Sequence, residues 1–164
     1  ASGSEHHLSH FFEITGIVHG EDYFPHGIDV AYSTVVTAEL REKLLQQPWP
    51  EIQYRPQRDA YIAEISRIYG PVAEGCIALQ DKVGLYQKDM LSIYQAKERE
   101  IRSVLAEMPA AGEIRKMLEA VGLEMDAFEK MYSPEKIRDA IAYAKELKDR
   151  YTVLWMYYDL FGGQ

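Results

Sequence analysis

The sequence predicts an all-α fold, a multi-helix bundle of about seven or eight helices, from three observations. Apolar residues recur three or four positions apart through most of the chain, which is the period of an amphipathic helix. No segment alternates apolar and polar residues for more than about five positions, so little favours strands. The 164 residues are 47% hydrophobic, enough for one buried core. We therefore expect a single helical domain over residues 1–164.

The first two helices are expected to form a hairpin. The first should run from Glu5 to about Ile14, with Ser2 or Ser4 as its N-cap. A glycine-containing connection over residues 15–24 can reverse the chain, so that the next helix begins near Pro25. A proline-rich loop over residues 46–51 then leads to the rest of the domain.

The later helices are predicted from apolar faces and from residues that start or stop helices. Apolar residues at helical spacing occur within residues 62–69, 91–108, 114–121 and 137–158. Glycine after a helix and a serine–proline pair before one are typical boundaries. Such boundaries are Gly70-Pro71, Gly122 and Ser133-Pro134-Glu135.

Composition argues against several partners and compartments. A net charge of −8 argues against nucleic acid or an anionic membrane as the main partner, because both need a basic face. No apolar run approaches the ~20 residues of a membrane span. The single cysteine, Cys76, excludes an internal disulfide and fits a reducing compartment, so we expect a cytoplasmic protein with a buried structural thiol.

The five histidines all fall within residues 6–26 and suggest a metal site. His6 and His10 are four residues apart, so they point the same way on a helix, while His7 is rotated by about 100°. Reversal of the chain brings His26 back towards the first helix. Two or three imidazoles converging between helices suit Zn²⁺, Fe²⁺ or Ni²⁺.

A catalytic metal usually has three protein ligands, and the sequence offers only two good ones besides His10. Glu5 and Asp29 are expected to serve helix termini instead. The missing ligand is therefore expected outside this chain, which we interpret as part of a longer protein. A histidine tag is disfavoured because apolar residues are interleaved with the histidines, but a polar helix without a metal remains an alternative.

Two motifs resemble the metal-binding domain of the iron-containing alcohol dehydrogenase and dehydroquinate synthase-like superfamily. The first is the helix Gly3-Ser4-Glu5-His6-His7-Leu8-Ser9-His10-Phe11, and the second is His26-Gly27-Ile28-Asp29-Val30-Ala31-Tyr32. Within that superfamily they are most similar to bacterial sn-glycerol-1-phosphate dehydrogenases. The late segment Lys148-Asp149-Arg150-Tyr151-Thr152-Val153-Leu154 is also similar to those enzymes.

The resemblance implies roles for individual residues. It implies that His6 and His26 bind a divalent metal together with an aspartate upstream of Ala1, and that His10, with His7 as an accessory, relays a proton. Arg150 is the residue we expect to contact a substrate phosphate. His19, followed by Gly20, is a rival for the second ligand, but His26 is preferred because the residues after it continue as the family's helix does.

The resemblance also implies an activity and partners. The complete enzyme would use NAD(P)H to reduce dihydroxyacetone phosphate, a small phosphorylated three-carbon substrate, to sn-glycerol 1-phosphate, and a homodimer is compatible with it. NAD(P) would be bound mainly by an N-terminal nucleotide-binding domain, whose glycine-rich fingerprint is absent from these residues. This chain alone is therefore expected to be inactive.

Two alternative functions remain open from the sequence. One is a related enzyme domain, from a glycerol dehydrogenase or a dehydroquinate synthase-like lyase. The other is a non-enzymatic helical interaction domain, in which some of the twelve tyrosines form a partner interface.

Overall fold

A computed structural model describes residues 3–162 and confirms the all-α bundle. Those residues form nine α-helices and three short 3-10 helices, and none of them forms a strand. The α-helices are α1 (Ser4–His19), α2 (His26–Gln46), α3 (Arg58–Tyr69), α4 (Ala73–Val83), α5 (Leu91–Ala106), α6 (Ala111–Ala120), α7 (Met125–Met131), α8 (Pro134–Tyr143) and α9 (Val153–Phe161). The 3-10 helices are η1 (Gly70–Val72), η2 (Leu85–Gln87) and η3 (Ala144–Leu147).

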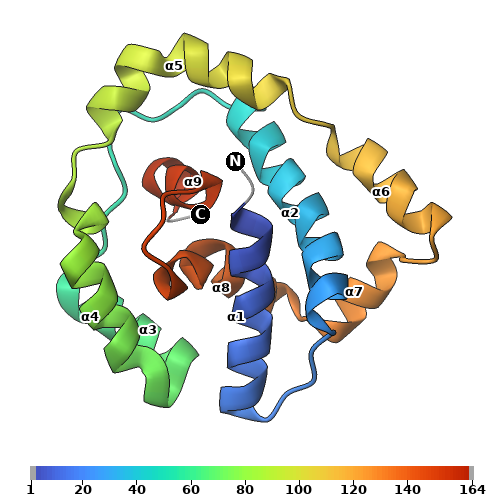
Figure 1. Cartoon of the computed structure of the whole chain (residues 1–164). Coiled ribbons are helices and arrows are strands. Elements are labelled where there is room, and N and C mark those ends of the chain that lie inside the picture. Colours follow the sequence, from blue (N-terminus) through green and yellow to red (C-terminus); the bar gives the residue numbers. More distant parts are fainter. Residues whose placement is uncertain (1–2, 163–164) are drawn as a thin grey trace.

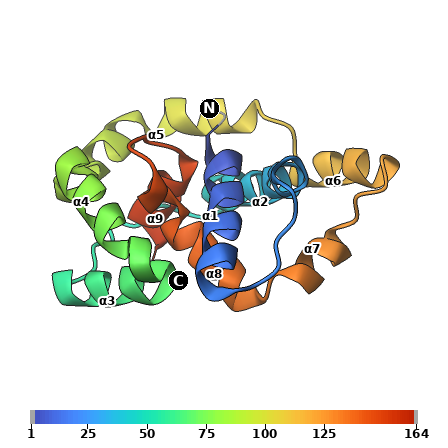
Figure 2. The same ribbon diagram turned by 60° about the horizontal axis from the view of Figure 1, so that its bottom comes forward.

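Helix α1 lies inside a broken ring made by the middle of the chain (Figure 1). Helix α2 runs antiparallel beside α1, with α3 and α4 on the opposite side, α5 across one end, and α6 and α7 beyond α2. The last helices, α8 and α9, return to the middle next to α1. Figure 2 shows the same helices in a broad, shallow arrangement. None of the described helices is both long and apolar enough to cross a membrane.

Helix α1 differs from the prediction at both ends. It continues past Ile14 to His19 and ends at Gly20, whose positive φ of 67° suits glycine. Gly3 is the N-cap, and no side chain of the described residues accepts a hydrogen bond there, so Ser4 does not cap the helix. Ser4 lies one position too far along, inside the helix, where its buried hydroxyl has no hydrogen-bond partner among residues 3–162. Ser2 lies outside the described residues.

The turn between α1 and α2 depends on close backbone packing at Gly16. The amide of Glu21 donates to the carbonyl of Gly16 at 2.8 Å. A Cβ atom at position 16 would lie 2.4 Å from Cδ1 of Tyr23, which is closer than two carbon atoms can approach. Glycine at this position therefore lets the connection fold back against α1 and begin α2 at His26.

The other predicted boundaries are confirmed. Gly70 and Gly122 have positive φ values of 49° and 88°. Gly70 directly follows α3, and Gly122 lies two residues beyond the end of α6. The Ser133 hydroxyl accepts a hydrogen bond from the amide of Lys136 at 3.1 Å, and Pro134 is the first residue of α8.

Apolar faces are buried in the middle of the bundle but only partly along α5 and α6. The main core includes Phe12 of α1, stacked on Tyr132 with ring centroids 3.9 Å apart. By contrast, Val104, Met117 and Val121 stay 61%, 58% and 72% exposed. These helices lie at the outer rim, so only part of each apolar face meets the bundle (Figure 1).

A buried ion pair ties η3 to the centre of the bundle. Lys145 and Glu146 are both 0% exposed, and Nζ of Lys145 lies 2.8 Å from Oε2 of Glu146. The hydroxyls of Tyr61 and Tyr86 donate to the two oxygens of Glu146 at 2.6 and 2.7 Å. Nζ also lies 3.4 Å from the centre of the Tyr158 ring, a cation–π contact. The pair is therefore satisfied although water does not reach it.

We predict that Glu146→Gln lowers the free energy of unfolding by about 3–5 kcal/mol, because it leaves the buried Lys145 charge without its counter-ion. Urea denaturation followed by circular dichroism measures this change. The matched control, Glu135→Gln on the exposed start of α8, should change stability by less than ~0.5 kcal/mol. A similarly small effect of Glu146→Gln would show that the pair contributes little.

Candidate functional site

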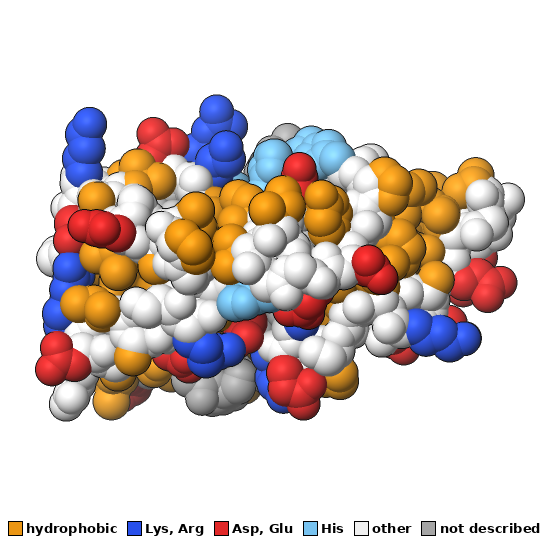
Figure 3. Space-filling model, turned by 90° about the horizontal axis from the view of Figure 1, so that it is seen from below, with side chains coloured by type: hydrophobic (Ala, Val, Ile, Leu, Met, Phe, Trp, Pro, Cys, Tyr) orange, Lys and Arg blue, Asp and Glu red, His pale blue; other side chains and the backbone are white. Residues whose placement is uncertain are grey.

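Three imidazoles come together where the start of α2 meets α1. The ring of His26, the first residue of α2, lies with its centroid 5.4 Å from that of His6 and 5.2 Å from that of His10. Figure 3 shows histidine side chains gathered at one edge of the molecule, beside Lys and Arg side chains. The expected convergence of these three residues is thus present, whereas the roles assigned to them remain predictions.

Ser9 fixes the orientation of His26. Its buried hydroxyl lies 2.9 Å from Nδ1 of His26 and 3.3 Å from the backbone carbonyl oxygen of the same residue. A carbonyl can only accept, so the single hydroxyl proton serves the carbonyl if both bonds form, and the hydroxyl oxygen then accepts from Nδ1–H. That arrangement leaves the lone pair on Nε2, where a metal can bind it.

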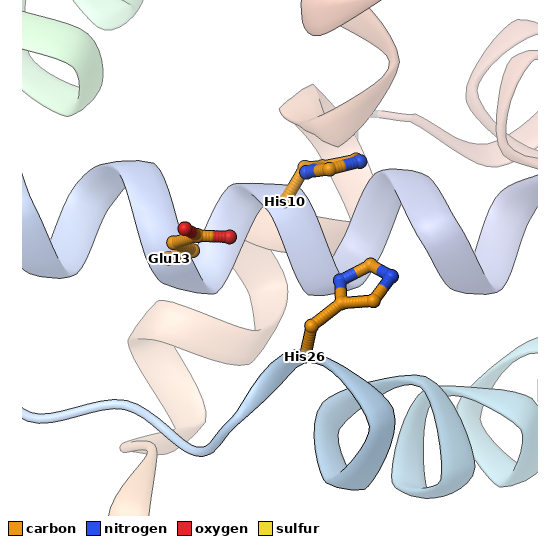
Figure 4. A group of neighbouring side chains, drawn as sticks. All are labelled: His10, Glu13 and His26. Atoms are coloured by element: carbon orange, nitrogen blue, oxygen red, sulfur yellow. The ribbon is translucent and has the colours of Figure 1, made fainter.

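Glu13 is a carboxylate near the site that the sequence analysis missed. One donor atom each from His10, Glu13 and His26 lie within 4.8 Å of one another (Figure 4). Glu13 follows His10 by three residues, so both side chains lie on the same face of α1. That spacing was the available signal, since a carboxylate and a histidine three apart often cooperate in metal sites of helical bundles.

The electrostatic setting favours the uncharged forms of His7 and His10. Burial, followed by the positive charge of Lys148, lowers the pKa of His7 to about 4. The pKa of His10 is also lowered, again by burial first and Lys148 second. A neutral imidazole can accept a proton. His7 itself is 3% exposed, and its Nδ1 has no hydrogen-bond partner within the described residues.

Two cationic side chains accompany the histidines. Lys148 and Arg150 are exposed, and both act electrostatically on His7. Their segment lies at the start of α1, because a Cβ added at Gly3 would be 3.2 Å from Cγ2 of Thr152. The buried amide of Gln80 donates to the Lys148 carbonyl at 2.9 Å and holds the backbone there. Arg150 was predicted from sequence, whereas Lys148, two residues earlier, was not.

His19 lies outside this group. It is the last residue of α1, and its Nε2 lies 2.8 Å from the carbonyl oxygen of Ile68 in α3. Because α1 extends four turns, His19 is at the far end of the helix from His6. The geometry therefore brings His26, and not its rival His19, to His6 and His10.

Asp29 is in the first turn of α2, as expected of a residue at a helix terminus, but its side chain is buried. The Tyr132 hydroxyl lies 2.8 and 2.9 Å from its two oxygens and donates to them. Burial raises the pKa of Asp29 to about 7, against the opposing effect of this hydrogen bond. Asp29 thus faces the core and not the imidazoles.

This raised pKa predicts a pH dependence of stability. Between about pH 4 and pH 7 the folded state keeps the Asp29 proton that the unfolded state has lost, so the contribution of this group falls as the pH rises. Asp29→Asn does not titrate but can still accept from Tyr132. The stability of the variant relative to the native chain should rise from about pH 4 to about pH 7 and then level off, as measured by urea denaturation. A constant difference between the two proteins would contradict the raised pKa.

The tyrosines proposed as a partner interface lie mostly in the core. Among those singled out from sequence, the buried ones are Tyr61, Tyr69, Tyr94, Tyr143 and Tyr158, while Tyr86 and Tyr157 are half-buried. Cys76 is buried as expected, and burial raises the pKa of its thiol to about 11. Neither feature offers an exposed functional surface.

Comparison with known proteins adds one relative. The chain is 25% identical over 154 residues to a protein of Bacillus licheniformis named glycerol-1-phosphate dehydrogenase (NAD(P)+). The chain resembles part of a dehydrogenase. The similarity covers 94% of the chain but only 28% of that enzyme, so the chain spans less than a third of its relative. No protein-family model and no solved structure matches the chain.

Proposed function

We propose that this chain is the metal- and substrate-binding domain of an NAD(P)-dependent polyol-phosphate dehydrogenase that interconverts dihydroxyacetone phosphate and sn-glycerol 1-phosphate. The observation that carries the proposal is the convergence of His6, His10 and His26 at one helix junction. The similarity of 94% of the chain to part of a glycerol-1-phosphate dehydrogenase supports it independently. The whole chain would act as one helical domain, with NAD(P) bound mainly by a nucleotide-binding domain outside these 164 residues.

The donors present fit a divalent transition metal. His6 and His26 would be the ligands from this chain, and the proposed third ligand is an aspartate from outside it. Imidazole suits Zn²⁺, Fe²⁺ and Ni²⁺ alike, so the donor set does not select among them. When bound, such an ion supplies a Lewis acid that polarises the substrate carbonyl while hydride arrives from the nicotinamide.

The remaining residues of the site have separate tasks in this proposal. His10 would exchange a proton with the substrate oxygen, because it is half-buried, lies next to His26, and its lowered pKa keeps it neutral. His7 would be an accessory behind it. Arg150, together with Lys148, would attract the substrate phosphate, since both cations lie beside the histidines.

We predict that the chain binds Zn²⁺ or Co²⁺, and that His6→Ala and His26→Ala each weaken binding by at least about 100-fold, because each removes a direct ligand. Isothermal titration calorimetry measures the affinity. His19→Ala is the matched control, since His19 contacts α3 instead, and it should bind as the native chain does. Native-like affinity in both His6→Ala and His26→Ala would exclude the proposed ligand pair.

We also predict that Arg150→Ala and Lys148→Ala weaken binding of dihydroxyacetone phosphate to the metal-loaded chain by roughly 10-fold each, with little effect on dihydroxyacetone. NMR chemical-shift titration of both compounds measures this difference. Lys97→Ala, an exposed cation on α5, serves as the control. Equal losses for both compounds would show that the cations do not recognise phosphate.

Turnover of dihydroxyacetone phosphate with NAD(P)H by the isolated chain would contradict the proposal that NAD(P) is bound mainly by a domain outside these residues.

A further inference from the structure

We propose that Ser9 and Glu13 are positioning residues, which hold His26 and His10 in the Nδ1–H tautomer so that the Nε2 atoms of both rings face one shared point. This inference rests on the proposed metal site and adds to it the residues that orient its imidazoles. It assigns Glu13 to a supporting position instead of direct coordination.

The contacts of His26 support a positioning role for Ser9. The Ser9 hydroxyl lies 2.9 Å from Nδ1 of His26 and 3.3 Å from the carbonyl oxygen of His26, so it contacts two groups of the first residue of α2. Ser9 is 0% exposed, which removes water as a competitor for these bonds. Metal coordination through Nδ1 would break the shorter bond and leave a buried hydroxyl with one partner fewer, which is unfavourable. Coordination through Nε2 keeps both bonds.

The placement of Glu13 beside the two rings supports its role in orienting His10. Figure 4 shows the Glu13 carboxylate on one side of the His10 and His26 rings, facing the nitrogen of each ring that lies nearer to it. The second nitrogen of each ring points away from Glu13, in a common direction. One donor atom each of His10, Glu13 and His26 lie within 4.8 Å of one another. Rotation of the Glu13 side chain, or one bridging water, can therefore give a hydrogen bond between its carboxylate and His10.

The arrangement follows a general requirement of histidine metal sites. A ligating imidazole usually donates its other N–H to a carboxylate, carbonyl or hydroxyl, and this bond sets both tautomer and ring orientation. In this chain α1 supplies both partners: Ser9 for the proposed ligand His26, and Glu13 for His10, whose free Nε2 would exchange the proton. A direct role for Glu13 as a ligand would place the metal on the Nδ1 side, where Ser9 already occupies His26.

The first test reads tautomers by two-dimensional ¹H–¹⁵N NMR of the metal-free, uniformly labelled chain. His10 and His26 should both show the Nδ1–H pattern. Ser9→Ala should shift only His26 towards Nε2–H, and Glu13→Ala should shift only His10. Glu119→Ala, which removes an exposed carboxylate on α6, should change neither. Nε2–H tautomers in the native chain, or tautomers unmoved by the two variants, would overturn the proposal.

The second test separates positioning from ligation and from failure of the site itself. Ser9→Ala should weaken Co²⁺ binding by about 10–100-fold while leaving the visible spectrum of the bound ion unchanged. Glu13→Ala acts on His10, which is not a proposed ligand, so it should leave both the affinity and the spectrum unchanged. A changed spectrum in Glu13→Ala would make Glu13 a ligand and overturn its positioning role. If His6→Ala and His26→Ala bind as the native chain does, the proposed metal site fails, while the tautomer result still decides the roles of Ser9 and Glu13.

Discussion

The antiparallel packing of α1 against α2 is the constraint on which the rest of the structure depends. It places residue 26, the first of α2, beside residues 6 and 10, although about four helical turns and a connection separate them along the chain. The close backbone approach at Gly16 and the left-handed Gly20 allow the reversal. Phe12, facing inward from the same helix, stacks on Tyr132 in the core. One helix thus carries an apolar face that packs in the core and a histidine face that meets the start of α2.

A second constraint brings the end of the chain to the same place. The buried pair Lys145 and Glu146 fixes η3 in the middle of the bundle. Gln80 of α4 then holds the backbone at Lys148, where the chain leaves η3. Because of these contacts, Lys148 and Arg150 add positive charge near His7 and His10, whose pKa values burial already lowers. A chain with a net charge of −8 therefore has a local cationic region at this site.

The fold class and the grouping of His6, His10 and His26 could be predicted because helical periodicity and local spacing determine them. The boundaries of Gly70, Gly122 and Ser133 could be predicted for the same reason. The full extent of α1 could not, because its last turn is stabilised by packing and by the close approach at Gly16. Lys148 was missed because its proximity to His7 depends on a long-range contact. The position of Glu13 on the same helix face as His10 could be predicted from their spacing. The burial of Asp29 could not, because it depends on packing against Tyr132, about a hundred residues away in the sequence.

Anomalous X-ray scattering tests most directly whether a metal binds where α1 meets the start of α2. Crystals of the chain grown with Zn²⁺ should be measured just above and just below the zinc absorption edge. We expect one strong anomalous difference peak within about 2.0–2.3 Å of a ring nitrogen of both His6 and His26, on the side away from Glu13. A zinc peak elsewhere on the molecule, with no density between these two rings, would contradict it.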